Sequence, residues 1–305
     1  MDYKPAIVRA FTALYEKEQL QKEPFKARAY RTFLQNIEPL PALHTMDDLH
    51  GVKGVGPKIK EKLQEIFRKG VLRVSQPSPL EILDVYGIGP VKANALQQQG
   101  IRTVDQLRAA LEKDPTLLND KQRIGLQYYE DLLQRIPRQE MAEHERLLTH
   151  YAPHPIELVG SYRRQAADSG DIDVLIRLPP NETPKAARDA FYAYVQQLQH
   201  TGYLQEILAL GEHKCMAIVH LPGHLSRRLD LLITPDHEYA CALLYFTGSN
   251  HFNVATRKHA LDMGYTLNEH ALTPLLSNAP TPPFRTEQDL FAFLGLAYVE
   301  PRDRV

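Results

Sequence analysis

The feature that most constrains this chain is a pair of aspartates placed directly before a short apolar run. Asp171 and Asp173 precede Val-Leu-Ile at 174–176, which predicts a buried strand. Residues i and i+2 of a strand point to the same face, so the two carboxylates would lie side by side. Neighbouring carboxylates repel each other, and Mg²⁺ prefers hard oxygen ligands, so the pair predicts a magnesium site.

Residues upstream and far downstream of this pair extend the predicted site. Gly160 and Ser161 offer backbone N–H groups and a hydroxyl where phosphate could approach closely, and Arg163 and Arg164 offer guanidinium groups. Asp230 lies inside an apolar strand-like run, where a charge is costly unless it is paired or metal-bound, so it is the predicted third ligand. A lone Asp-x-Asp is more often a solvated turn or a cap, but this combination favours phosphate and Mg²⁺ chemistry.

The composition is that of an ordinary soluble chain. Its 305 residues suffice for two or more packed domains, and no apolar run approaches membrane-spanning length. The N-terminal Met-Asp-Tyr-Lys-Pro lacks the pattern of a signal peptide, and the two cysteines, Cys215 and Cys241, suit a reducing compartment. We therefore expect an intracellular protein, without distinguishing nucleus, cytoplasm and virus particle.

The N-terminal quarter is basic and carries the first copy of a repeated motif. Residues 1–75 contain fourteen Lys and Arg against nine Asp and Glu, which indicates a polyanionic partner. Gly54-Val-Gly-Pro recurs 33 residues later as Gly87-Ile-Gly-Pro, and each proline would begin a helix whose N-terminal N–H groups bind anions. One copy is more often a plain interhelical turn. Two copies resemble paired helix-hairpin-helix motifs, which hold nucleic-acid backbones.

The remaining pattern predicts helices up to about residue 137 and then an α/β domain. Lys58 and Lys62 lie off the apolar stripe of the helix after the first repeat, which by itself indicates a solvated face. Residues 75–79, Ser-Gln-Pro-Ser-Pro, are typical of a linker. From residue 155 onwards we expect a mixed sheet with helices on one face. The strands are expected at 156–159, 171–176, about 204–210, about 214–220 and 229–233, and a helix at about 185–199.

Two further groups have competing interpretations. His213, His220 and His224 suggest a metal site, but no cysteine or acidic residue completes one at ligand spacing, so surface or packing roles are favoured. Tyr245 and Phe246, beside a glycine break, suggest a platform for a nucleotide sugar. Without further context, core aromatics on a helix are the favoured interpretation of that pair.

The glycine-serine pair, the Asp-x-Asp and the distant aspartate together resemble the nucleotidyltransferase active site. The longer pattern resembles the family X DNA polymerases over essentially the whole chain, above all their minimal polymerase beta form. It comprises Gly-Ser-Tyr-Arg-Arg at 160–164, Gly-Asp-Ile-Asp at 170–173 and Tyr-Phe-Thr-Gly-Ser at 245–249. The resemblance implies an α+β multidomain fold. Its expected parts are an all-helical helix-hairpin-helix lyase-like domain (1–75), a helical DNA-binding thumb (76–137), a catalytic palm with a mixed sheet (138–234) and a small α/β nucleotide-selecting subdomain (235–305).

The same resemblance implies roles for individual residues. Asp171, Asp173 and Asp230 would hold two Mg²⁺, with Mn²⁺ as a substitute, and Lys62 would be the Schiff-base nucleophile of a 5′-deoxyribose-phosphate lyase. The implied nucleotide-binding residues are Arg135, Gly160, Ser161, Arg164, Ser169, Gly170, Tyr245, Phe246, Gly248, Asn250 and Asn253. The implied DNA-binding residues are Lys26, Tyr30, Gly54, Gly56, Lys58, Gly87, Gly89, Arg228 and Arg257. The hairpin loops would bind K⁺ or Na⁺ through backbone carbonyls.

Four positions depart from the family pattern. Phe25 stands where a histidine is typical and Val74 where a lysine is typical, which weakens the expected binding of a 5′-phosphate. Asn250 replaces an aspartate near the incoming base, and His270 replaces a tyrosine. The lyase activity and the fidelity of relatives therefore do not transfer directly to this chain.

The resemblance predicts a DNA-directed DNA polymerase that fills short gaps during base-excision repair. Its partners would be gapped or nicked DNA with a 5′-phosphate and deoxynucleoside triphosphates, and we expect a monomer with no membrane partner. Three alternatives stay open: a template-independent nucleotidyltransferase, a non-catalytic gapped-DNA-binding scaffold, and a lyase whose polymerase half is vestigial.

Overall fold

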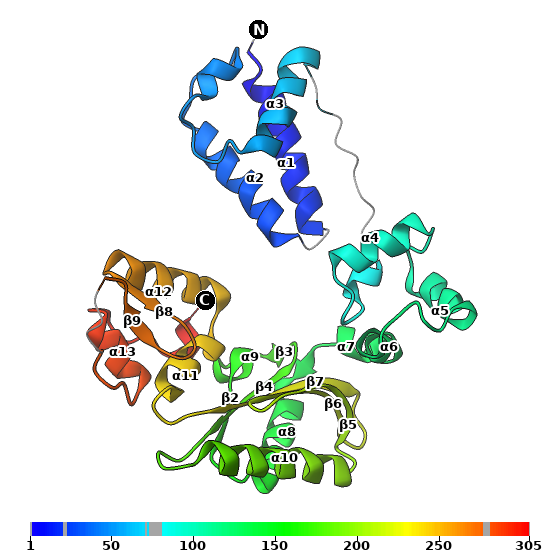
Figure 1. The fold of residues 1–305 in the computed structure, drawn as a ribbon, viewed down its shortest axis with the longest axis vertical. Helices are drawn as coiled ribbons and strands as arrows, with labels where there is room; N and C mark the ends of the chain where they lie inside the picture. The colour runs from blue at the N-terminus through cyan, green and yellow to red at the C-terminus, as the bar shows by residue number, and fades with distance from the viewer. Residues whose placement is uncertain (1, 21–22, 71, 73–80, 277–280, 305) are drawn as a thin grey trace. The chain divides into compact units, whose positions relative to one another are not determined.

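The computed structural model describes residues 2–20, 23–70, 72, 81–276 and 281–304. The chain divides into two compact units, Met1–Gln127 and Tyr128–Val305, which are described separately below (Figure 1). The linker predicted at 75–79 lies outside the described residues, as does Val74. The four predicted domain boundaries stay a prediction.

The first part of the N-terminal unit is a small helical domain with its own core. Ile7 and Phe11 on its first helix pack against Phe33 on the second and Leu63 on the third, and all four side chains are fully buried. The apolar stripe predicted after the first repeat is therefore confirmed as the buried face of that helix. The elements are α1 (Lys4–Leu20), α2 (Pro24–Ile37), η1 (Met46–Leu49) and α3 (Pro57–Lys69).

The two Gly-x-Gly-Pro repeats adopt closely similar backbones. In each, the first glycine has a positive φ, +93° at Gly54 and +86° at Gly87, a conformation that side-chain-bearing residues rarely adopt. The second glycine is the extended N-cap of a helix whose first residue is proline, as predicted. The second repeat lies among η2 (Glu81–Asp84), α4 (Pro90–Gln98), α5 (Val104–Lys113) and α6 (Asp120–Gln127).

The C-terminal unit is built on a five-stranded mixed sheet with the strand order β2-β4-β7-β6-β5. Within this sheet, as far as the structure describes it, β4 and β7 pair in parallel and the other pairs are antiparallel. The predicted mixed sheet is thus confirmed. The strands are β2 (Ile156–Leu158), β4 (Ile172–Arg177), β5 (Leu204–Leu210), β6 (Lys214–His220) and β7 (Ser226–Thr234). Two short strands, β1 (Ile136–Pro137) and β3 (Asp168–Ser169), pair beside it.

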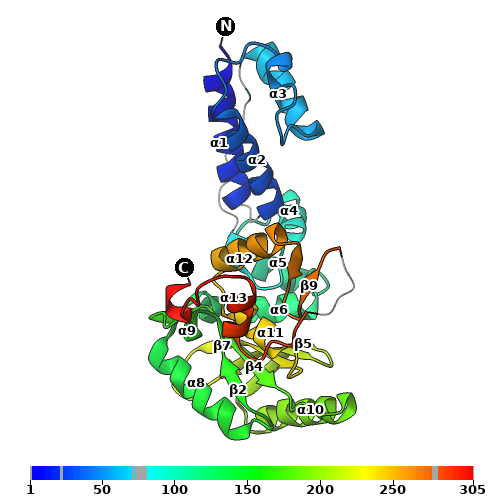
Figure 2. The ribbon, with the colours of Figure 1, turned by 90° about the vertical axis from the view of Figure 1, so that its left-hand side faces the viewer.

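Alternation along β4 separates the two faces of the sheet. Val174 and Ile176 face the main core, which the long helices α8 (Arg138–Tyr151) and α10 (Pro184–His200) cover on one side (Figure 2). Leu175 faces the opposite side and packs with Ala242 of α11 (Tyr239–Thr247). Since side chains alternate along a strand, Asp173 shares the face of Leu175, away from the main core. The remaining helices of this region are α7 (Tyr129–Leu133) and α9 (Gly160–Arg163).

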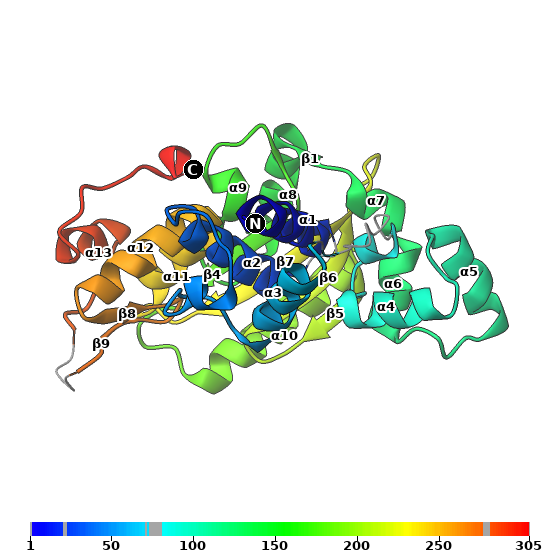
Figure 3. The same ribbon diagram turned by 90° about the horizontal axis from the view of Figure 1, so that it is seen from above.

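The end of the chain forms a small α/β group with a separate core (Figure 3). Leu244, Ala260 and Leu290 are fully or almost fully buried in it. Cys241 lies in the same core and Cys215 lies in the sheet, so both cysteines are packing residues. No helix among the described residues is long and apolar enough to span a membrane. The elements are α11 (Tyr239–Thr247), α12 (Asn250–Asp262), β8 (Tyr265–Leu267), β9 (Leu272–Pro274), α13 (Glu287–Phe293) and η3 (Pro301–Asp303).

Candidate active site

The structure brings two of the three predicted metal ligands directly together. In the parallel register of β4 and β7, Asp173 lies opposite Asp230, and Asp171 immediately precedes β4. Asp230 is only 8% exposed. Burial, with a further contribution from the Asp230 charge, raises the pKa of Asp173 to about 6. Two partly desolvated carboxylates on adjacent strands are stable as anions only when a cation neutralises them.

Two cationic side chains lie beside the three aspartates in the structure. Lys214 Nζ lies 2.9 Å from one carboxylate oxygen of Asp230, and Arg228 pairs with Asp171. The other oxygen of Asp230, Oδ1, is buried with no hydrogen-bond partner among the described residues. Within these residues no group of three His, Cys, Asp or Glu side chains surrounds one metal position. The all-oxygen donors and the unpartnered Oδ1 nevertheless fit Mg²⁺, and the metal role stays a prediction.

Gly160 sets the distance between the backbone of α9 and Asp173. Its φ is +62°, and a Cβ built there would lie 2.9 Å from Asp173 Oδ2. Ser161, the next residue, donates its hydroxyl to Ser169 Oγ at 2.9 Å. The glycine therefore allows a close approach between the turn predicted to bind phosphate and the predicted metal ligands.

Pairing of β1 with β3 brings further predicted phosphate-binding residues together. Arg135 precedes β1 and makes an ion pair with Asp168 of β3, with 2.7 Å between Nη2 and Oδ1. A Cβ on Gly170 would lie 2.9 Å from Arg135 Nη1, so this arginine passes directly over the glycine. Arg135, Ser161, Ser169 and Gly170 thus gather near one point. Asp168 was not anticipated, because its partner lies 33 residues away in the sequence.

A cleft of about 390 Å³ lies at the other end of α9. Tyr245 and Phe246 are half-buried and line it, so the aromatic pair is not confined to a core. Arg164 donates to the Thr247 carbonyl oxygen at 2.6 Å, and Asn253 Nδ2 donates to the Tyr245 carbonyl oxygen at 2.7 Å. Every lining residue except Val254 was predicted to bind nucleotide or DNA. The lining comprises Arg164, Tyr245, Phe246, Gly248, Asn250, Asn253, Val254 and Arg257.

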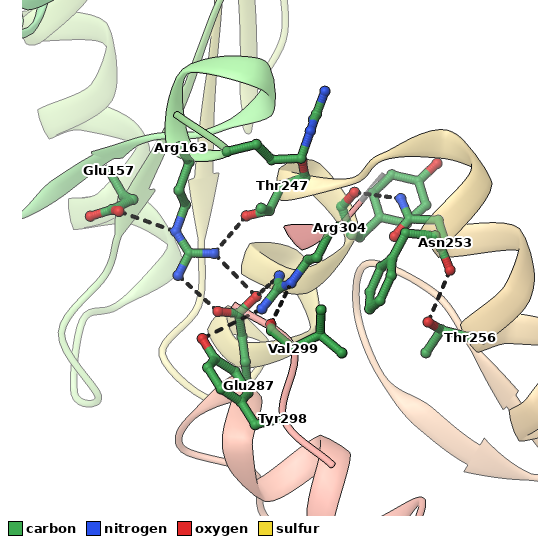
Figure 4. Close-up of polar contacts among 12 residues, drawn as sticks. Glu157, Arg163, Thr247, Asn253, Thr256, Glu287, Tyr298, Val299 and Arg304 are labelled. Atoms are coloured by element: carbon green, nitrogen blue, oxygen red, sulfur yellow. Dashed lines mark hydrogen bonds and ion pairs between the residues drawn. The ribbon is translucent and has the colours of Figure 1, made fainter. Parts of the chain in front are cut away.

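Arg163 lies beside Arg164 but does not turn toward phosphate-binding groups. It makes hydrogen bonds to Glu287 and to the hydroxyl of Thr247, and it is largely buried (Figure 4). The expectation that both arginines offer guanidinium groups to phosphate is therefore wrong for Arg163. Successive residues of a helical turn point in different directions, so only one of the two can face the cleft.

The residues predicted for a lyase lie on α2 and α3. Lys58 is exposed and Lys62 is half-buried on α3. Lys26, expected to help bind phosphate, pairs with Glu23 at 3.2 Å and lies 3.8 Å from Glu18, so carboxylates partly neutralise it. Tyr30 is 8% exposed and belongs to the core of this domain, whereas Phe25 is 86% exposed. The DNA-binding roles of these residues stay predictions.

Some histidines of the second unit contact polar side chains. His224 contacts Glu140 and Glu143 at 3.5 and 3.1 Å, and His144 Nδ1 lies 2.7 Å from the Tyr203 hydroxyl. Glu140 is itself held by Arg227 at 2.7 Å. The spacing in the sequence did not indicate that His224 lies beside two glutamates, and the choice between a packing role and a metal role stays a prediction.

Four family models match successive parts of the chain. The helix-hairpin-helix domain model matches residues 2–72, the fingers domain of DNA polymerase lambda matches 80–133, the DNA polymerase beta palm matches 135–236 and the DNA polymerase beta thumb matches 242–305. These models name residues 80–133 fingers and residues 242–305 thumb. We had expected the thumb at residues 76–137.

Curated relatives match along nearly the full chain. DNA polymerase lambda of Rattus norvegicus is 33% identical over 99% of this chain and 56% of its own length. DNA polymerase lambda of Arabidopsis thaliana is 28% identical over 99% of this chain and 63% of its own length. A DNA polymerase type-X family protein of Schizosaccharomyces pombe is 24% identical over 98% of this chain and 64% of its own length. The chain thus spans between half and two thirds of the length of these relatives. Three of the four matching models name a DNA polymerase, and with these relatives they show that the chain belongs to the type-X family of DNA polymerases.

Proposed function

We propose that this chain is a DNA-directed DNA polymerase that fills short gaps in base-excision repair. The observation that carries the proposal is the position of α9. Gly160 at its start contacts Asp173 of the aspartate pair, and Arg164 just after its end lines the cleft. A triphosphate bound along α9 would join the two places, with its sugar and base in the cleft. The relatives carry the name DNA polymerase, which agrees with this activity.

In this proposal the aspartates bind the metal ions and accept a proton during nucleotidyl transfer. Mg²⁺ bound by Asp171, Asp173 and Asp230, with Mn²⁺ as a substitute, would neutralise the aspartates, lower the pKa of the primer 3′-OH and stabilise charge on the leaving pyrophosphate. Asp230 Oδ1, which is buried without a hydrogen-bond partner among the described residues, accepts the proton of the 3′-OH directly or orders the group that does.

The groups at the two ends of α9 orient the nucleotide. Arg135, Ser161, Arg164 and Gly170 hold the β- and γ-phosphates through guanidinium, hydroxyl and backbone N–H groups. The sugar lies against Tyr245 and Phe246. Asn253 and Arg257 reach the minor-groove edge, where they test the shape of the base pair without reading its sequence.

In the same proposal the N-terminal unit binds the DNA on either side of the gap. The two hairpin loops hold the backbone through the helix N-termini at Pro57 and Pro90, with K⁺ or Na⁺ at their carbonyls. Lys62 would attack a 5′-deoxyribose phosphate as a Schiff-base nucleophile, while Lys26 and Lys58 bind the phosphate. The divisions 1–75, 76–137, 138–234 and 235–305 correspond to lyase-like, DNA-binding, catalytic and nucleotide-selecting parts. The protein would act as a monomer inside the cell.

Single-nucleotide incorporation on a one-nucleotide gapped duplex with a 5′-phosphate tests the proposal. The parent is compared with Asp230→Ala and with Asp189→Ala, which removes an exposed carboxylate of α10. We expect templated incorporation with Mg²⁺ that is stronger on the gap than on an ungapped primer-template, that is lost in Asp230→Ala and that is kept in Asp189→Ala. Incorporation that ignores the template would indicate a transferase, and gapped-DNA binding without incorporation would indicate a scaffold.

A further inference from the structure

A buried carboxylate connects the palm, the last helix and the C-terminal segment. Glu287 begins α13, is 2% exposed and lies between two guanidinium groups (Figure 4). Arg163 donates to it at 2.8 and 3.2 Å, and Arg304 donates at 2.5 Å. Arg304 itself is fully buried. A buried charge is costly without a partner, so these three side chains are stable only together.

This group of three residues reaches the cleft through the loop at 247–249. Arg163 Nη1 donates to the Thr247 hydroxyl at 2.8 Å, and the backbone N–H of Ser249 donates to the Arg304 carbonyl oxygen at 3.3 Å. Gly248, between these two anchored residues, lines the cleft. Glu287 does not line the cleft. The loop is therefore held on both sides of Gly248 by residues whose own positions depend on Glu287.

We propose that Glu287 is a positioning residue for nucleotide binding, which it supports by fixing Arg163 and Arg304 against the loop at 247–249. This inference rests on the polymerase function proposed above. Without the carboxylate, two guanidinium groups would face each other with little solvent to screen their repulsion. Arg163 has another partner, Glu157 at 3.2 Å on β2, toward which it would turn and so release Thr247.

Steady-state kinetics on gapped DNA test this role. We expect Glu287→Gln to raise the KM for the complementary nucleotide about tenfold, a usual size for coupled sites, while gapped-DNA affinity stays unchanged. The kcat should stay within about threefold, because the aspartates and the 3′-OH are not displaced. Thr247→Val removes the hydroxyl that Arg163 contacts with little change of shape, and it should raise KM in the same direction. Glu300→Gln, an exposed acid of the same subdomain, is the control.

The outcomes separate this inference from the function on which it rests. A parent that incorporates no nucleotide would overturn the proposed polymerase function. An active parent whose KM is unchanged in both Glu287→Gln and Thr247→Val would overturn the positioning role alone. If circular dichroism shows that Glu287→Gln does not fold, Thr247→Val decides by itself, and an unchanged KM there refutes the inference.

Discussion

Replacing Gly160 with alanine tests whether the backbone at the start of α9 sets the position of the Asp173 carboxylate. An added Cβ would lie 2.9 Å from Asp173 Oδ2, too close unless one of the two groups moves. The matched control is Gly202→Ala, between α10 and β5. Gly202 has a similar φ, +76° against +62°, but nothing lies within 4 Å of the added Cβ. Both substitutions strain the backbone, but only the Cβ added at Gly160 contacts Asp173.

The expected magnitudes follow from this difference. Placing alanine in a left-handed conformation costs about 1–2 kcal/mol, so each variant should unfold roughly 3–6 °C below the parent. Only Gly160→Ala also displaces Asp173, by several tenths of an ångström. Since a misplacement of about 1 Å costs on the order of a hundredfold in rate, we expect a roughly tenfold to hundredfold loss of incorporation in that variant alone.

Single-turnover incorporation on gapped DNA with Mg²⁺, together with thermal unfolding, measures both effects. We expect similar Tm values for the two variants and a rate loss confined to Gly160→Ala. Equal rates in the two variants would refute this expectation, because the close approach of Gly160 to Asp173 would then have no bearing on the reaction.

Three further predictions concern burial, charge and packing. Burial lowers the pKa of His144 from 6.5 to about 4, so the unfolded state binds more protons in this window and the free energy of unfolding decreases as the pH is lowered from 7 to 4. The stability difference between the parent and His144→Phe, measured by denaturant titration, should shrink by about 3 kcal/mol from pH 7 to pH 4. Lys214→Met removes the cation beside Asp230 and should tighten Mn²⁺ binding severalfold, seen by electron paramagnetic resonance; unchanged binding would contradict this. Gly125→Ala would place a Cβ 2.0 Å from the Tyr86 carbonyl oxygen and should destabilise the helical unit by about 1–3 kcal/mol, measured by circular dichroism; an unchanged melt would contradict this.

The strands and helix starts of this protein could be predicted because their signals are local. The apolar run after Asp173 and the run around Asp230 became β4 and β7, since short buried runs next to polar residues are typical of central strands. Pro57 and Pro90 each begin a helix, because proline lacks the N–H that a first helical residue leaves unpaired.

The partners of the site residues could not be predicted in the same way. The parallel register that places Asp173 opposite Asp230 pairs residues 57 positions apart in the sequence, and no local pattern determines that register. The contact between Arg163 and Glu287 joins positions 124 residues apart, and no local pattern signals it. That Arg163 turns away from the cleft while Arg164 faces it depends on the same tertiary contact.

Burial separates the cations that can exchange partners from those that cannot. Arg135 and Asp168 are 57% and 50% exposed in their ion pair, so the pair contributes at most about 1 kcal/mol and a triphosphate can displace the carboxylate at little cost. The side chains of Arg304 and Glu287 are 0% and 2% exposed, and breaking that pair would leave two uncompensated buried charges. Both arginines lie in the second compact unit, and both face a carboxylate. Their different solvent access therefore makes Arg135 suitable for binding substrate and confines Arg304 to holding the fold around it.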